Sequence, residues 1–319
     1  MSSSLPRRSK HDEHDNLTIG TPIGVCPDGK VRKPVCIPPE MRARHVHLIG
    51  ACGTGKSTLM EAMILDDVRR GNGVAVLDPH GVLTREVACL LAEQDIERAI
   101  YMDFSNPDWV LRWNPLRCDV NKMRSRTADD IVRAFKGLSC DWKDCIEHLL
   151  RQAVYAVLHL PNGNLLDVSY LLRKDSVESH QLRSRFSSLI DDELSRDFWQ
   201  HDFDRYNRAD LLIAQHRLSR LLVCESVGPM LSQGDSAFSF RDVMDTGKVL
   251  LVDLSGISPQ VRNTLGRLIL SLLHLAALGR RGDRELSYRP FHVYCDDAQM
   301  FMGDEIEYSS RRPAGPGYR

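Results

Sequence analysis

The feature of the sequence that most constrains the fold is a glycine-rich run placed between an apolar segment and a helical pattern. Residues 50–57 read GACGTGKS and match the pattern G-x-x-x-x-G-K-[ST]. The preceding segment from His45, HVHLIG, is apolar enough for a strand, and residues 57–71 place apolar side chains at helical spacing. A strand, a glycine-rich turn and a helix in this order predict an α/β fold that carries a phosphate-binding loop.

This loop predicts nucleotide binding. Glycines let successive backbone N–H groups turn towards phosphate oxygens, and the N-terminus of the following helix adds positive potential. In this pattern the lysine reaches the β and γ phosphate oxygens, and the hydroxyl after it ligates Mg²⁺. The residues predicted to hold the nucleotide are therefore Gly50, Ala51, Cys52, Gly53, Thr54, Gly55, Lys56 and Ser57, with Ser57 as a metal ligand.

Short apolar segments alternate with helical patterns on both sides of a long helical stretch. Such alternation is typical of a mostly parallel sheet flanked by helices. In chain order, the expected elements after the loop helix are strand 74–78, helix 83–94, strand 99–104, strand 247–255, helix 259–278 and strand 291–295.

Between the two α/β parts the pattern is almost entirely helical, so we expect an all-helical insertion that interrupts the core. Helices are predicted there at 165–173, 180–200 and 209–223. The predicted organisation is a disordered tail at 1–20, an extended or hairpin-like lead-in at 21–44, a core at 45–118 and 246–303, the insertion at 119–245 and an irregular tail at 304–319.

Charge and cysteine usage restrict the class of protein. The chain has 42 Lys and Arg against 43 Asp and Glu, a net charge of -1, so any DNA contact must be local. Its nine cysteines form no C-x-x-C pair and no signal peptide is recognisable, which predicts reduced thiols and a cytoplasmic protein. The most apolar stretch, 265–278, contains Arg267 and His274 and is shorter than the roughly 20 residues of a membrane span, so we expect no transmembrane segment.

Three expected strands end in an aspartate, namely Asp78, Asp253 and Asp296. A phosphate-loop enzyme needs one such carboxylate to hold the water shell of Mg²⁺, and spacing alone does not choose among them. Only Asp296 is followed by a second acid, Asp297, as required when the next residue polarises the attacking water. Asp296 is therefore the predicted metal carboxylate, acting through water. Together with Lys56, Asp296 and Asp297 are the predicted catalytic residues.

Further motifs follow the phosphate loop in a specific order. DPHG stands at 78–81, Asn-Pro-Leu at 114–116, Phe-Arg-Asp at 240–242 and CDDAQ at 295–299. In this order they resemble the conjugative DNA-transfer ATPases of type IV secretion, TraG-like members of the HerA/FtsK superfamily. The resemblance covers about residues 40–303, and the motifs other than the loop are fairly specific.

The resemblance implies a RecA-like ATPase core with a helical insertion, in a homo-oligomer, usually a hexameric ring, that moves DNA or protein. It implies ATP and Mg²⁺ as cofactors, with Lys56, Ser57 and Thr58 on ATP-Mg and Asp296 as the Walker B acid. It also implies secretion-machinery proteins as partners. Asp297 stands where the family usually has the catalytic Glu, and because Asp is one methylene shorter, slow hydrolysis is expected to be possible.

A second departure concerns the sheet. In the family, a helix and a strand carrying a polar sensor follow the Walker B segment, and that strand lies between the phosphate-loop strand and the Walker B strand. Here only residues 300–319 follow Gln299, with no strand pattern, so the edges of two core strands are expected to lack ladder partners. A C-terminally truncated or frame-shifted relative and a compact variant that fills the gap differently both remain open, as does a strand supplied by another chain.

Two functions therefore stand side by side. The first is an ATP hydrolase, a motor subunit that drives DNA or protein translocation in conjugation or type IV secretion. The alternative is a nucleotide-binding switch or partner subunit that does not hydrolyse ATP. The transported substrate and the ring size stay open.

Two weaker candidate sites have two interpretations each. His80 either approaches the nucleotide or belongs to a turn held by Pro79 and Gly81. Arginines in the insertion either contact DNA phosphates or form an ordinary solvated face with their acidic neighbours. The arginines are Arg183, Arg185, Arg205, Arg208, Arg217 and Arg220.

Overall fold

The structure of the chain is a computed structural model. It describes residues 20–28, 31–42, 45–117, 123–136, 142–190, 192–280 and 289–302. The predicted tail at 304–319 and all but the last residue of the tail at 1–20 lie outside the described residues.

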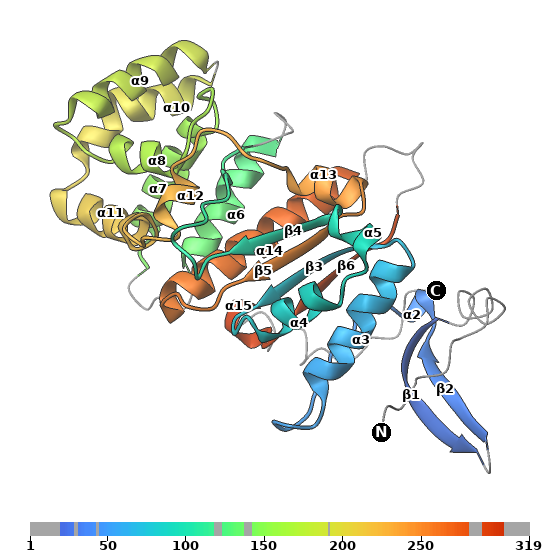
Figure 1. Cartoon of the computed structure of the whole chain (residues 1–319). Coiled ribbons are helices and arrows are strands. Elements are labelled where there is room, and N and C mark those ends of the chain that lie inside the picture. The colour runs from blue at the N-terminus through green and yellow to red at the C-terminus, as the bar shows by residue number, and fades with distance from the viewer. Residues whose placement is uncertain are drawn as a thin grey trace, which may run out of the picture.

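A four-stranded parallel sheet forms the centre of the molecule (Figure 1). Its order is β4-β5-β3-β6, with β3 at Gly73–Asp78, β4 at Ala99–Asp103, β5 at Val249–Asp253 and β6 at Phe291–Cys295. All three ladders are parallel, and the register places Asp78 opposite Asp253. The mostly parallel α/β core predicted from the alternation is confirmed, with the four later strands where the pattern placed them.

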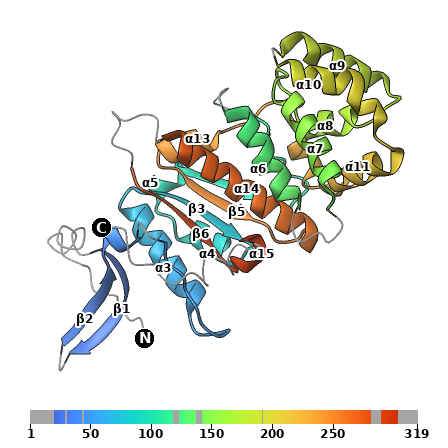
Figure 2. The ribbon, with the colours of Figure 1, turned by 180° about the vertical axis from the view of Figure 1, so that it is seen from behind.

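Helices cover both faces of this sheet. On one face lie α3 (Lys56–Arg69) and α4 (Val82–Leu90), followed by the short α5 (Glu93–Ile96), and on the other lies the long α14 (Pro259–Arg280) (Figures 1 and 2). Along β3, Val74 and Val76 are buried in a cluster with α3 and α4, whereas Ala75 and Leu77 are buried in the larger cluster on the opposite face. This alternation follows from the two-residue period of a strand, which sends successive side chains to opposite faces.

Between β4 and β5 the described residues form helices and turns, with no strand among them. α6 packs against α14 on the sheet, and α13 also lies on α14, while α7 to α12 form a helical lobe to one side (Figures 1 and 2). The helices are α6 (Arg124–Lys136), α7 (Asp144–Val157), α8 (Leu165–Leu171), α9 (Val177–Leu189), α10 (Glu193–Asp197), η2 (Phe198–Asp202), η3 (Phe203–Arg205), α11 (Arg208–Leu222), α12 (Gly228–Leu231) and α13 (Phe240–Asp245).

The segment ahead of the phosphate loop is a hairpin. β1 (Thr21–Asp28) pairs antiparallel with β2 (Val31–Ile37), and the one-turn helix α2 (Pro39–Arg42) follows. The hairpin stands beside α3 rather than joining the central sheet (Figure 1). The structure therefore places a separate two-stranded element next to the helix that carries the phosphate loop.

The strand expected over residues 45–50 is wrong, because the structure has no strand there. The side chains of Val46 and Ile49 are 42% and 84% exposed, and His45 has a φ of 69°. Among the described residues β6 pairs with β3 alone, so its other edge carries no ladder partner. An apolar segment forms a strand only where its N–H and C=O groups pair with a neighbouring strand, and no described strand pairs with residues 45–50.

The last described element is α15 (Gln299–Met302), which follows β6 and packs on α14. A methyl group added to Gly266 of α14 would lie 2.2 Å from the Phe301 ring, so the two helices approach closely at this point. In the described part of the chain no helix is long and apolar enough to cross a membrane.

Candidate nucleotide site

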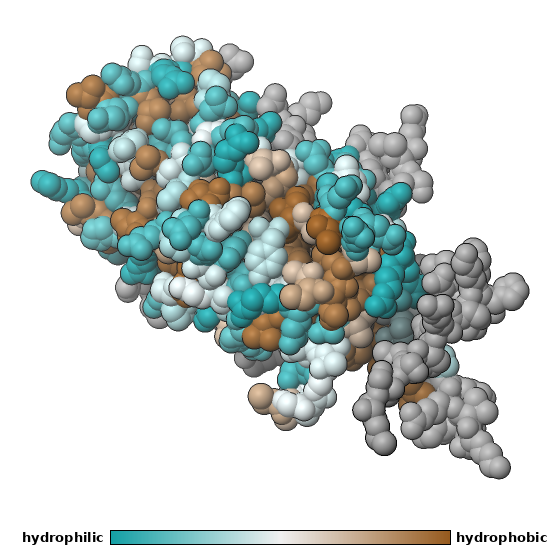
Figure 3. Space-filling model, in the orientation of Figure 1, coloured by the Kyte–Doolittle hydropathy of each residue, from teal (hydrophilic) through white to brown (hydrophobic). Residues whose placement is uncertain are grey.

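The phosphate loop projects from the edge of the molecule at the N-terminus of α3 (Figures 1 and 3). Gly53 and Gly55 have φ values of 76° and 85°, in the left-handed region that favours glycine. The Nζ of Lys56 donates hydrogen bonds to the carbonyl oxygens of Gly50 and Ala51, both at 2.9 Å. The lysine therefore lies folded across its own loop, with its ammonium held next to the backbone that it follows.

The residues of this loop fit a phosphate group. Gly55 precedes α3 and places no side-chain cap on it, so the N–H groups of the first helical turn face outwards as an anion site. A methyl group on Gly50 would lie 2.6 Å from Thr54 Oγ1, which shows how tightly the loop closes. Ser57 and Thr58 are exposed in the first turn, where a hydroxyl can reach a metal ion. The structure thus brings residues 50–58 together around one concave turn.

The three strand-end aspartates differ in burial and hydrogen bonding, and two of them are buried and hydrogen-bonded. Asp78 is buried and accepts hydrogen bonds from the backbone N–H groups of His80 at 2.8 Å and Thr84 at 3.0 Å. Asp253 is buried and accepts a hydrogen bond from Arg85 Nη1 at 3.1 Å. Both carboxylates are buried and hydrogen-bonded at the carboxyl edge of the sheet, Asp253 also by the Ser255 N–H at 2.9 Å, so each is less open to a metal ion than an unengaged carboxylate.

Asp296 is the strand-end aspartate with the most open carboxylate. Its backbone N–H donates to the Leu77 carbonyl at 3.0 Å, which fixes the residue directly beyond β6. Within the described chain its carboxylate accepts one hydrogen bond, from the Asp297 N–H at 3.2 Å. Burial raises the pKa of Asp296, and the negative charges of Asp297 and Asp78 raise it further. A cation would relieve this unfavourable charge, so the geometry favours Asp296 over Asp78 and Asp253.

Asp297 makes two side-chain contacts across the carboxyl edge of the sheet. Its Oδ2 lies 2.9 Å from His80 Nε2, and its Oδ1 accepts a hydrogen bond from Gln299 Nε2 at 3.1 Å. The hydrogen bond from His80 lowers the pKa of Asp297, and the charge of Lys56 acts in the same direction. Lys56 is therefore near enough for its charge to favour the ionised form of Asp297.

The backbone explains why this acid is an aspartate. Asp297 has a φ of 44°, in the left-handed region, which Asp and Asn enter more readily than residues with longer side chains. The departure from the family's Glu thus coincides with a backbone conformation that suits Asp. The His80 ring contacts Asp297, and its approach to the nucleotide stays a prediction.

Sequence reasoning missed a buried ionic cluster that anchors the start of the phosphate-loop segment. Arg42 donates to both carboxylate oxygens of Asp67 in α3, each at 2.9 Å, and to the Tyr294 hydroxyl of β6 at 2.7 Å. Tyr294 in turn donates to Asp67, and Asn72 Nδ2 donates to Asp67 at 3.0 Å. Burial raises the pKa of Tyr294, and the Asp67 carboxylate raises it further. No local pattern marks these residues, since 252 positions separate Arg42 from Tyr294.

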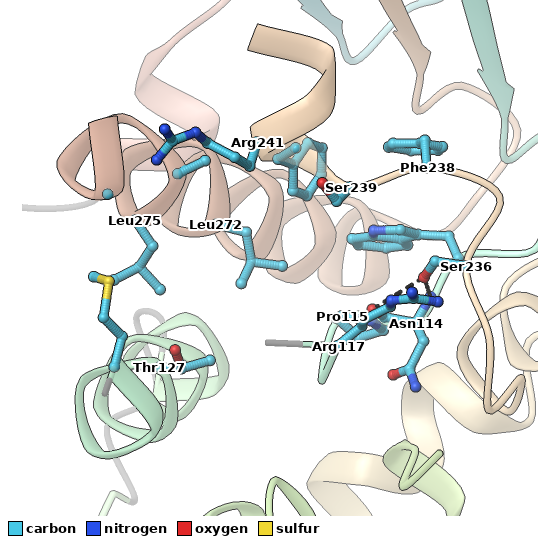
Figure 4. A pocket seen from close by; sticks show the side chains of 15 residues that line it. Asn114, Pro115, Arg117, Thr127, Ser236, Phe238, Ser239, Arg241, Leu272 and Leu275 are labelled. Atoms are coloured by element: carbon cyan, nitrogen blue, oxygen red, sulfur yellow. Dashed lines mark hydrogen bonds between the residues drawn. The ribbon is translucent and has the colours of Figure 1, made fainter. Parts of the chain in front are cut away.

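The Asn-Pro-Leu motif holds the exit of β4 against the helical lobe. The amide of Asn114 donates to the carbonyl oxygens of Gly163 at 2.8 Å and Gly234 at 3.3 Å, and its own carbonyl accepts from the Leu116 N–H at 2.9 Å. Its backbone N–H donates to Ser236 Oγ at 2.7 Å (Figure 4). This motif is therefore a structural junction between core and lobe.

A pocket lies beside this junction, between α6, α13 and α14 (Figure 4). Trp113 lines it and packs edge to face on Phe104 and on Phe240, the first residue of the Phe-Arg-Asp motif. None of the residues predicted to bind nucleotide lines the pocket. The two family motifs at 114–116 and 240–242 meet here, away from the phosphate loop.

Three of the six arginines considered for DNA contact are engaged within the lobe. The Arg183 guanidinium lies 4.5 Å from the centre of the Phe203 ring, and burial lowers its pKa. Arg205 forms an ion pair with Asp202 at 2.8 Å. Arg217 lies over the Trp142 ring, and Arg185, Arg208 and Arg220 are exposed. DNA contact by these residues stays a prediction.

Comparison with known families and structures agrees with the motifs. The family model described as the type IV secretion-system coupling protein DNA-binding domain matches residues 32–96, which include the phosphate loop. No match was found among curated proteins.

Solved structures of one coupling protein share the fold. The unbound monoclinic form of the bacterial conjugative coupling protein TrwBdeltaN70 is 13% identical, with a TM-score of 0.57 over 87% of this chain and 68% of that one. The plasmid coupling protein TrwB in complex with ADP and Mg²⁺ is 14% identical, with a TM-score of 0.58 over 87% of this chain and 70% of that one. The chain therefore has a RecA-like fold and is similar to the type IV coupling proteins, as its motifs predict.

Proposed function

We propose that this chain, which is similar to the coupling proteins of type IV secretion, binds ATP with Mg²⁺ and hydrolyses it as a motor subunit for DNA or protein translocation. The observation that carries the proposal is the placement of the phosphate loop and the acid pair. Lys56 follows the glycine-rich loop, Asp296 and Asp297 end β6, and the charge of Lys56 acts on Asp297. Solved complexes of TrwB with ADP and Mg²⁺, with an ATP analogue and with a GTP analogue support nucleotide binding at such a loop.

In this proposal the loop holds the phosphates through its backbone. The N–H groups from Gly53 to Ser57 surround the phosphate oxygens, and Thr58 completes the first turn of α3. Lys56 would exchange its hydrogen bonds to the carbonyl oxygens of Gly50 and Ala51 for bonds to the β and γ phosphate oxygens.

The metal is held by two residues from separate elements. Ser57 would bind the metal ion through its hydroxyl, and Asp296 would hold the water shell of the ion from the end of β6. When bound, Mg²⁺ neutralises charge on the β and γ phosphates. Asp296 suits this role because its carboxylate is less engaged than those of Asp78 and Asp253.

Assembly and substrate follow from the resemblance to coupling proteins. We propose a homo-oligomer, a hexameric ring in the family's form, through which DNA or protein moves and which meets secretion-machinery proteins in the cytoplasm. The description of the matching family as a DNA-binding domain favours DNA. Because the net charge of the chain is -1, the DNA track is confined to a pore or patch rather than spread over the surface.

The experiment is a DNA-stimulated ATPase assay on the full chain and on Lys56→Ala. We expect phosphate release by the wild type, stimulated by single- or double-stranded DNA, and at least about a hundredfold less release by the variant, because an electrostatic phosphate contact is removed. If the wild type releases phosphate no faster than Lys56→Ala, with and without DNA, the motor function is refuted.

The second candidate is a nucleotide-binding switch or partner subunit that does not hydrolyse ATP. A specific observation favours it, because both oxygens of the short Asp297 side chain already have partners in His80 and Gln299. Tight ATP binding that Lys56→Ala abolishes, together with no phosphate release by the wild type, would identify this function. Turnover that appears in Asp297→Glu would strengthen the identification.

A further inference from the structure

We propose that His80 and Asp297 act as a dyad in which His80 accepts the proton of the attacking water. The inference rests on the proposed ATP hydrolysis and names a residue that performs part of it. The two residues stand 217 positions apart, at the carboxyl ends of neighbouring strands β3 and β6, and meet at 2.9 Å between Nε2 and Oδ2.

The first argument is the tautomer that this contact imposes. Asp297 Oδ2 is a hydrogen-bond acceptor, so the facing Nε2 of His80 carries the proton of the ring. The lone pair of the neutral ring then lies on Nδ1. In the described part of the chain Nδ1 has no recorded hydrogen-bond partner, and the His80 side chain is 49% exposed. The dyad therefore presents a basic nitrogen to solvent while a carboxylate supports the ring from behind.

The second argument is that the turn does not need the ring. Asp78 already holds the DPHG turn through the N–H groups of His80 and Thr84, and Arg262 Nη1 donates to the Pro79 carbonyl at 3.2 Å. Gly81 supplies the left-handed residue, with a φ of 74°. The imidazole is thus free of a structural task in the turn, and its contact with Asp297 calls for another explanation.

The Asp297 side chain is shorter than the Glu that usually stands at this position in the coupling-protein relatives. A carboxylate one methylene shorter than Glu stands further from a water that approaches the γ phosphate. Asp297 is in addition turned towards Gln299 and His80. An imidazole on its Oδ2 extends the acid by the width of a ring, and the proton-accepting Nδ1 lies beyond Nε2, farther from the carboxylate. The dyad supplies the length that the shorter residue lacks.

The proposed step balances as follows. His80 Nδ1 accepts a proton from water as the water oxygen forms a bond to the γ phosphorus, and the bond between that phosphorus and the β–γ bridging oxygen breaks. The bridging oxygen leaves on ADP with the electron pair. Asp297 stabilises the resulting imidazolium, which later returns its proton to solvent.

The experiment compares three variants of the full chain with the wild type. His80→Gln keeps an amide donor for Asp297 and removes the basic nitrogen, and His80→Ala removes both. The double variant His80→Ala/Asp297→Glu replaces the dyad by one longer carboxylate. His180→Ala, an exposed histidine of the helical lobe, is the matched control. The readouts are kcat for phosphate release, the Kd of a fluorescent ATP analogue, and the thermal unfolding midpoint.

We expect kcat to fall about a hundredfold in both single His80 variants, with the Kd and the unfolding midpoint unchanged, because general-base catalysis of this kind contributes two orders of magnitude or more. The double variant recovers at least tenfold over His80→Ala, and His180→Ala behaves as the wild type. Recovery by a longer acid is not expected of a purely structural histidine.

Two outcomes overturn the inference and differ from each other. Wild-type turnover that persists in His80→Gln shows that His80 is at most a donor that positions Asp297, and the proposed function survives. A wild type without turnover above Lys56→Ala refutes the proposed hydrolysis itself, and the dyad is refuted with it.

Discussion

Replacing Arg42 by Met is expected to destabilise the chain far more than the loss of an ordinary surface ion pair. The Arg42 and Asp67 side chains are 8% and 1% exposed, so the pair is shielded from water. The variant leaves the Asp67 carboxylate buried, with hydrogen bonds from Tyr294 and Asn72 and with His292 Nε2, at 3.6 Å, in place of the permanent charge of Arg42. Removing one partner of such a pair costs about 3–5 kcal/mol of unfolding free energy.

A double-mutant cycle separates the pair from its surroundings. Asp67→Leu is expected to be destabilising as well, because it leaves the Arg42 guanidinium without its carboxylate. In Arg42→Met/Asp67→Leu neither charge remains, so the double variant is less destabilised than the sum of the two single variants by about 2–3 kcal/mol. Arg205→Met is the control, since its pair with Asp202 is 77% and 46% exposed and surface pairs contribute little.

The assay is urea denaturation followed by tryptophan fluorescence, with the unfolding free energy of each variant compared under one buffer. A cost for Arg42→Met no greater than that for Arg205→Met would refute the reasoning. So would strict additivity in the cycle, because it would mean that the two charges do not interact in the folded chain.

Three further predictions concern the loop, a turn and a buried histidine. Alkylation of the exposed Cys52 in the phosphate loop is expected to slow at least about tenfold in saturating ATP-Mg, because bound phosphate covers the loop. The alkylation rate of the exposed Cys89 is expected to stay unchanged, and peptide mass spectrometry measures both rates. Equal slowing at both thiols, or at neither, would contradict the proposed site. Gly81→Ala is expected to lower the unfolding free energy by at least about 2 kcal/mol in the urea assay, because its φ is 74° and the added Cβ would lie 2.4 Å from a carboxylate oxygen at the end of β5. Gly24→Ala is the control, since a Cβ added there meets open space. A similar loss of unfolding free energy in both variants would be inconsistent with this geometry. Burial lowers the pKa of His292 below its usual value of 6.5, so the unfolded chain binds more protons than the folded chain below about pH 6.5, and stability falls as the pH drops through that range. His292→Gln is therefore expected to reduce the slope of unfolding free energy against pH between about 7.5 and 5.5. An unchanged slope would argue against the prediction.

The features that sequence could predict are those that local pattern encodes. Glycine spacing at 50–57 predicted a phosphate-binding turn, in which Gly53 and Gly55 have left-handed φ values, and apolar runs predicted β3 to β6 within a residue or two. The same reasoning failed at 45–50, where the apolar pattern of a strand is present and the strand is not. A strand is a pairing between segments, so its own residues cannot guarantee it.

The acid pair, Asp296 and Asp297, also has features that the sequence predicts and features that only the structure shows. Adjacent aspartates at 296 and 297 were identifiable from the sequence, and their order after a buried strand selected Asp296 for the metal. The structure supplied an independent reason, the burial and engagement of Asp78 and Asp253. It also added a partner for Asp297 that no spacing rule connects to it.

By itself, then, the sequence indicated a phosphate loop ahead of a helix and a parallel α/β core split by helices, and it predicted the chemistry at 50–58 and 296–297. Only the tertiary structure decided that His80 meets Asp297, that Arg42 meets Asp67 and Tyr294, and that the segment before the loop stays unpaired. The physical reason is the separation along the chain over which each kind of interaction acts. Periodicity and turn chemistry act over a few residues, whereas strand order brings together side chains more than 200 positions apart, and that order follows from how the whole sheet is covered and paired.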